Sequence, residues 1–151
     1  MFLKILAAVA AALFFSSGAS AQLPVSERQE LVIVTDAGEK RFQVELADEP
    51  EEQRTGLMFR REMAPDEGML FDFQTVRDVT MWMRNTYLPL DMIFIREDGT
   101  IHTIARRTTP LSERTISSGG PVRYVLEVNA GVSDALGIAP GDQVKAPAIT
   151  P

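Results

Sequence analysis

Two acidic residues stand in apolar segments and are the best candidates for acid–base chemistry. Asp91 begins the run DMIFI, and Glu127 lies within the run YVLEV. A pair of buried carboxyl groups, one with a raised pKa as the acid and the other as base or nucleophile, is what a glycoside hydrolase requires. If Glu127 reached a cleft, it would be the strongest catalytic acid in the chain.

Buried carboxylates are more often neutralised by a cation than used in catalysis. Arginines are plentiful in the sequence, so we expect ion pairs of Asp91 with Arg106 and of Glu127 with Arg84 or Arg60. Glu127→Gln should then lower the melting temperature, because it would leave an arginine without its partner.

The only tryptophan suggests a binding surface. With a period of two, Trp82 shares one side of a strand with Thr80, Arg84 and Thr86. An aromatic ring beside a guanidinium and amide donors suits a sugar or an anionic small molecule. Alternatively, Trp82 closes one end of the core with Arg84 stacked on it. The candidate ligand-binding residues are Trp82, Arg84, Asn85, Thr86, Arg60 and Glu127.

The methionines raise a second binding hypothesis. Thioether groups bind Cu(I) and Ag(I), and the chain has seven methionines. The same strand period places Met81 and Met83 with Val79 on the side opposite Trp82. We therefore expect these methionines to be core residues and not metal ligands. We therefore predict no metal site, and no cofactor.

His102 is the only histidine and the chain has no cysteine. A histidine-based zinc site, a structural zinc site and a cysteine nucleophile are thereby excluded. A serine triad would need His102, but the sequence has no Gly-x-Ser-x-Gly motif. We expect His102 to be a hydrogen-bonded residue of a strand.

The N-terminal 21 residues have the pattern of a secretory signal peptide. Lys4 precedes the apolar run 5–15, and Ala19-Ser20-Ala21 forms a small-residue cleavage site. The apolar run is too short for a stable transmembrane helix, so we expect cleavage after Ala21, release into the periplasm or medium, and no membrane span afterwards. A formal net charge of −6 argues against nucleic acid as a partner.

The remaining chain has the length of one domain. We expect a flexible leader at 22–29, a single β-rich domain at 30–146 and a tail at 147–151. Predicted strands cover 31–34, 42–46, 68–73, 80–84, 91–97, 100–106, 122–129 and a short stretch near 144; predicted helices follow a capping box at 48–51 and cover 132–136. This pattern predicts an α+β, mainly antiparallel fold with a small barrel-like sheet and two short helices.

The turn Asp98-Gly99 is the clearest local signal. A two-residue loop there pairs Asp91 with Arg106, Ile93 with Ile104, and Ile95 with His102. The segment 107–121 has no periodicity, so we expect a long loop there.

Several motifs are similar to those of the family called domain of unknown function 192. They are Gly56-Leu57-Met58 with Arg60, Gly68-Met69-Leu70-Phe71 with Phe73, Trp82-Met83-Arg84-Asn85-Thr86 with Pro89-Leu90-Asp91, Tyr124-Val125-Leu126-Glu127 with Gly131, and Gly141-Asp142. The resemblance covers roughly residues 30 to 145 and implies a small, β-rich, often exported domain. The family has no assigned reaction, so the resemblance implies no catalytic residue.

Taken together, these features favour an exported binding or accessory module rather than an enzyme, with a small molecule or saccharide as its ligand beside Trp82. One alternative is a hydrolase that uses Glu127 and Asp91 on a cell-wall or sugar substrate. The other alternative is a periplasmic Cu(I) or Ag(I) carrier.

Overall fold

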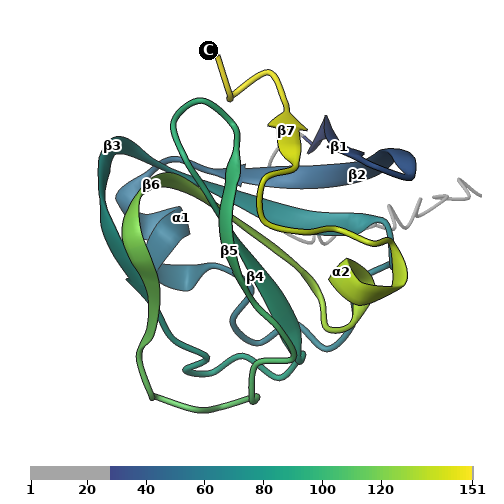
Figure 1. The fold of residues 1–151 in the computed structure, drawn as a ribbon. Helices are drawn as coiled ribbons and strands as arrows, with labels where there is room; N and C mark the ends of the chain where they lie inside the picture. Colours follow the sequence, from purple (N-terminus) through teal and green to yellow (C-terminus); the bar gives the residue numbers. More distant parts are fainter. Residues whose placement is uncertain (1–27, 151) are drawn as a thin grey trace, which may run out of the picture.

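The computed structural model describes residues 28–150; the predicted signal peptide and the leader up to residue 27 lie outside them. The elements are β1 (Arg28–Thr35), β2 (Gly38–Ala47), α1 (Pro50–Thr55), β3 (Glu67–Met81), β4 (Leu90–Ile95), β5 (Ile101–Ala105), β6 (Ile116–Asn129), α2 (Val132–Ala135) and β7 (Gln143–Lys145). They form the predicted fold class, a curled, mainly antiparallel sheet with two short helices (Figure 1).

The strand order in the sheet is β5-β4-β6-β3-β2-β1-β7. Only β2 and β3 run parallel, because the chain between them passes through α1. The sheet curls until its two ends meet, where Thr100 forms a bridge with Gln143. There the amide of Val144 donates to the carbonyl of Gly99 over 2.8 Å. This junction makes the sheet barrel-like, since it pairs strands that would otherwise be open edges.

The first hairpin follows the sequence pattern. Strands β1 and β2 pair from Arg28 opposite Glu45 to Thr35 opposite Gly38. Strand β1 therefore includes two residues that the sequence analysis placed in the leader. At the other end of the chain, Ile149 is 7% exposed, so the packed domain also extends beyond residue 146.

Helix α1 begins one residue later than the predicted capping box. Its N-cap is Glu49, and the carboxylate of Glu52 accepts the Glu49 amide over 3.3 Å. Pro50 occupies the first turn, and Gly56 ends the helix with φ 47° and ψ −134°.

The predicted strands 68–73 and 80–84 are one continuous strand, β3, which ends at Met81. An irregularity joins the two parts: Gln74 has φ 61°, and the register to β6 shifts between Asp72 and Arg77. Strand β6 likewise begins at Ile116, so the predicted 107–121 loop is shorter than expected. The prediction missed both extensions because the outer parts of the two strands pair mainly with each other and carry little hydrophobic alternation.

The β4–β5 hairpin forms, but its turn is not the predicted two-residue loop. The Gly99 amide donates to the Arg96 carbonyl over 3.0 Å, and Gly99 has φ 84°. This is a longer turn with a glycine bulge, which shifts the register so that Ile95 pairs with Ile101 and not with His102. The inner pair of Ile93 with Ile104 is as predicted.

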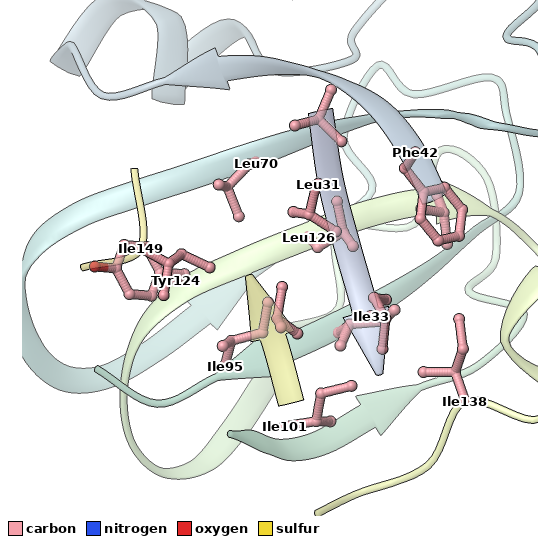
Figure 2. Packing of buried hydrophobic residues seen from close by; sticks show 14 residues of the cluster. Leu31, Ile33, Phe42, Leu70, Ile95, Ile101, Tyr124, Leu126, Ile138 and Ile149 are labelled. Atoms are coloured by element: carbon pink, nitrogen blue, oxygen red, sulfur yellow. The ribbon is translucent and has the colours of Figure 1, made fainter. Parts of the chain in front are cut away.

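Apolar side chains from all seven strands fill the interior of the curled sheet. Figure 2 shows Leu31, Leu70, Tyr124, Leu126 and Ile95 directed into this space. A second buried cluster covers the other face of the sheet; it comprises Ala47, Leu57, Met69, Phe71, Val79, Met83, Leu90, Met92, Phe94, Val122 and Val125. The candidate functional site lies beside this second cluster.

Candidate functional site

Glu127 lies near the C-terminal end of β6, between two methionines of the neighbouring strands. Met69 of β3 and Met92 of β4 are its cross-strand partners. The residue is 4% exposed. Burial is the sole cause that raises the pKa of its carboxyl to about 8, so the group is largely protonated at neutral pH.

The predicted arginine partners of Glu127 are engaged elsewhere. Arg60 makes a two-pronged ion pair with Glu45, with distances of 2.6 and 2.5 Å between nitrogen and oxygen atoms. The Arg84 Nε lies 3.5 Å from a carboxylate oxygen of Glu113. Within residues 28–150, no ion pair reaches Glu127, so the prediction of Arg84 or Arg60 as its partner is wrong.

In the described part of the chain, Asp91 has no arginine partner either. It is fully buried, and its Oδ1 accepts the backbone amide of Arg107 over 2.8 Å. Its Oδ2 accepts the amides of Gly131 and Ser133, over 3.1 and 3.0 Å, at the start of α2. The prediction of an Asp91–Arg106 pair is wrong, because Arg106 binds Asp134 over 2.7 Å. Asp91 thus ties the start of α2 to the sheet.

A cavity of about 450 Å³ opens between α1 and the end of β3, with Glu127 in its wall. The apolar side chains of its lining are Pro50, Leu57, Met58, Phe71, Phe73, Met81 and Trp82. Besides Glu127, the polar side chains of the lining are Gln53, Arg54, Thr55, Thr80, Thr86 and Thr115. A mostly apolar cavity with a few polar groups is the usual form of a small-molecule site.

Trp82 stands at this cavity, 45% exposed. The guanidinium carbon of Arg84 lies 5.4 Å from the centre of the indole ring, as the stacking alternative predicted. Met81 lines the same cavity, so the inference that Met81 and Trp82 face opposite sides is wrong. The period of two fails because β3 ends at Met81 and Trp82 lies beyond it. Met83 is buried as predicted, at 1% exposure.

The predicted ligand-binding residues are only partly brought together. Trp82, Thr86 and Glu127 line the cavity, and Arg84 stacks on the Trp82 ring. The side-chain nitrogen of Asn85 lies 3.9 Å from the sulfur of a lining residue, Met58.

Other features of the cavity were not predicted. Arg60 is absent from the lining because it binds Glu45 on β2. Sequence reasoning missed Met58, Phe71 and Phe73 as lining residues, because methionine and phenylalanine in apolar segments normally belong to the core. Their place in the family motifs was the one signal that could have identified them.

His102 lies in a different part of the molecule from the methionines of the cavity. Its ring nitrogens lie 2.8 Å from a guanidinium nitrogen of Arg96 and 3.2 Å from the carbonyl oxygen of Gly119. The residues that the structure describes contain no cluster of three histidine, cysteine, aspartate or glutamate side chains able to hold a metal ion. No helix in the range 28–150 is long and apolar enough to span a membrane.

Two solved structures are similar to the chain over most of its length. A protein of Sinorhizobium meliloti 1021, described as a candidate transcription regulator, is 52% identical with a TM-score of 0.77; the match covers 79% of this chain and 93% of that one. A protein of unknown function from Novosphingobium aromaticivorans DSM 12444 is 40% identical with a TM-score of 0.78, covering 83% and 91%. A comparison with curated proteins finds no match.

The family comparison agrees with the motifs of the sequence. The profile of the DUF192 family, described as "Uncharacterized ACR", matches residues 32–146. This range contains the cavity and both carboxyl groups. The chain therefore belongs to the DUF192 family of uncharacterised proteins.

Proposed function

We propose that this protein is a small-molecule binding module whose ligand occupies the cavity between α1 and the end of β3. One observation carries the proposal: the buried carboxyl of Glu127, which has no ion-pair partner within residues 28–150, faces a cavity with apolar and aromatic walls. A buried carboxyl without a partner lowers the free energy of unfolding. Such destabilising groups are found mainly where function requires them.

The chemistry of the lining favours a ligand with an apolar body and few polar groups. The half-exposed ring of Trp82 offers a surface for stacking, as a sugar ring would use. Thr80 and Thr115 add exposed hydroxyl groups at the cavity. An anionic ligand fits less well, because the buried ionisable group is itself an acid.

A hydrolase that uses Glu127 and Asp91 together is not supported. The Asp91 carboxylate accepts three backbone amides and is absent from the cavity lining. The regulator description of the Sinorhizobium protein also finds little support in this chain, since a formal net charge of −6 opposes binding to nucleic acid.

Export to the periplasm forms part of the proposal, supported by the sequence pattern of residues 1–21. N-terminal sequencing of the protein recovered from a periplasmic fraction should begin at Gln22. Recovery of the full-length chain in the cytoplasmic fraction alone would contradict export.

The binding proposal is tested with Trp82 fluorescence, because this is the only tryptophan in the chain. A panel of sugars, small aromatic compounds and amines is titrated while emission and thermal unfolding are recorded. A true ligand at a hundred times its dissociation constant should add about 2.7 kcal/mol to the free energy of unfolding. Phe73→Ala should weaken binding, whereas Val76→Ala, at an exposed site outside this cavity, should not. A panel without any saturable response would contradict the proposal.

A soft-metal carrier is the second candidate, because Met58 and Met81 line the same cavity as Trp82. Thioethers bind Cu(I) and Ag(I), and an indole can lie over the bound cation. The carrier hypothesis predicts stabilisation by Ag(I) that is lost in Met81→Leu, which keeps the volume and removes the sulfur. If Ag(I) stabilised the parent protein and Met81→Leu equally, the metal would not be bound by the sulfur of Met81.

A further inference from the structure

We infer that the cavity selects organic cations, namely ligands that carry an alkylammonium group on an apolar body. The inference rests on the proposed function, since it names the ligand class of the same cavity. Its basis is the combination of an unpaired buried carboxyl with aromatic and thioether walls.

No positively charged side chain within residues 28–150 forms an ion pair with Glu127. Its strand neighbours Met69 and Met92 are neutral, and the ion pairs of residues 28–150 do not include it. A buried carboxylate is stable only when paired, and residues 28–150 supply no partner. A cationic ligand would complete the pair, and because the Glu127 carboxyl is itself buried the attraction would be stronger than between two exposed charges.

The aromatic residues of the cavity already hold cations at its margins. The guanidinium carbon of Arg84 lies 5.4 Å from the Trp82 ring centre, and that of Arg77 lies 4.8 Å from the Phe73 ring centre. Phe71 and Phe73 stack with their ring centres 6.3 Å apart. Rings of this kind attract alkylammonium groups through their negatively polarised faces, which is the principle of an aromatic cage.

Most of the other charged groups near the cavity are paired, but Arg77 makes no ion pair within residues 28–150 and lies over the Phe73 ring. The Arg84 Nε lies 3.5 Å from a carboxylate oxygen of Glu113. Arg54 of α1, the second ionisable residue of the lining, makes an ion pair with Glu51 and is exposed to solvent. On β3, Asp72 is paired with Arg123. Glu127 is the one acid among the lining residues, so it is the negative charge that a ligand in the cavity would sense.

Cation binding requires the ionised form of Glu127, which gives it a characteristic pH dependence. Because burial raises the pKa of Glu127 to about 8, only on the order of 1% of the carboxyl is ionised at pH 6 and about 90% at pH 9. The dissociation constant of a cation should then fall by up to about 100-fold from pH 6 to pH 9. A neutral ligand that accepts a hydrogen bond from the protonated carboxyl should show the opposite trend.

The test compares choline with 3,3-dimethylbutan-1-ol, which has the same shape without the charge. Both are titrated into the full chain at pH 6 and pH 9 with Trp82 emission as the readout. The inference predicts that choline binds more tightly than the alcohol at pH 9 and loses this advantage at pH 6. Glu127→Gln should remove both the preference and its pH dependence, whereas Glu62→Gln removes the same charge at an exposed residue outside the lining and should change neither.

Each result separates the cation inference from the proposed function. Tighter binding of the alcohol at both pH values would overturn the inference but support a small-molecule cavity. A choline preference that persists in Glu127→Gln would also overturn it, since the charge would then be sensed elsewhere. If neither compound binds, the cation inference fails, and the proposed function is decided by the neutral compounds of the ligand panel.

Discussion

Asp91 of β4 and Glu127 of β6 point to opposite faces of the sheet, although their strands are hydrogen-bonded neighbours. Glu127 is paired with Met92, whereas Asp91 is paired with Val128. Paired residues share a face and successive residues alternate, so the two carboxyl groups diverge. One carboxyl ties the start of α2 to the sheet and the other faces the cavity. The two groups could not act together on one bond, which removes the main basis for the hydrolase hypothesis.

Glu127→Gln should stabilise the protein at alkaline pH. Because the pKa of Glu127 rises from 4.5 to about 8 on folding, the folded state binds more protons than the unfolded state between these values. Stability should therefore fall as pH rises from about 4.5 to 8, by on the order of 5 kcal/mol at most. The neutral amide of the variant has no such penalty, so urea unfolding should show the variant equal to the parent near pH 4.5 and more stable at pH 8.5.

This expectation reverses the sequence-based prediction that Glu127→Gln lowers the melting temperature. That prediction assumed an arginine partner, which the structure does not provide. Glu97→Gln, at an exposed carboxylate, serves as the control and should leave the pH profile of stability essentially unchanged. A Glu127→Gln protein that is less stable at pH 8.5 would show that the carboxylate has a cationic partner after all.

Asp91→Ala should be strongly destabilising. The substitution leaves the amides of Arg107, Gly131 and Ser133 without their acceptor. The Ser133 bond is buried and the other two are partly buried; since each buried amide that loses its acceptor costs roughly 1 to 3 kcal/mol, a total loss of about 3 kcal/mol is expected in urea unfolding. Asp134→Ala removes an exposed carboxylate of the same region and should cost less than about 1 kcal/mol. Similar losses for the two variants would contradict the tethering role of Asp91.

The fold class was predictable because its local signals are strong. The alternation of Phe42 and Val44 with polar residues, next to a turn, specifies the first hairpin without help from distant residues. The positive φ of Gly99 was also predictable from its turn. The lengths of β3 and β6 were not, since their irregular outer halves are held by each other and not by local propensity.

The cavity was less predictable than the fold. Trp82 and Glu127 were identified as candidates from their residue types. That both line the same cavity depends on how α1, β3 and β6 are arranged. The partner of a buried acid is set by the register of strands far apart in sequence, which local patterns do not encode. Arg60 is an example. The sequence alone does not distinguish Glu127 from Glu45 as its partner, and the register of β2 places Glu45 beside it.

Met83→Ala should cost on the order of 2 to 5 kcal/mol, because it removes a fully packed side chain and leaves a space in the second cluster. The hydroxyl of Thr108 donates toward the Met83 sulfur over 3.1 Å and toward the Leu90 carbonyl over 2.9 Å, so it keeps an acceptor in the variant. Chemical denaturation measures the loss. Met58→Ala, at a partly exposed cavity residue, should cost clearly less. Equal losses would mean that the cavity side of the cluster is as tightly packed as its centre.

Gly99→Ala should disturb the junction that closes the sheet. Gly99 has φ 84°, and a Cβ atom there would lie 2.5 Å from the carbonyl oxygen of Val144. Gly38 has a similar φ of 94° but open space around it, so Gly38→Ala measures the backbone strain alone, about 1 to 2 kcal/mol. Gly99→Ala should cost more than this control, because the clash adds to the strain. Since the Val144 amide donates to the Gly99 carbonyl, its hydrogen exchange should accelerate in Gly99→Ala and stay unchanged in Gly38→Ala. Equal exchange rates in the two variants would show that the ends of the sheet do not depend on this contact.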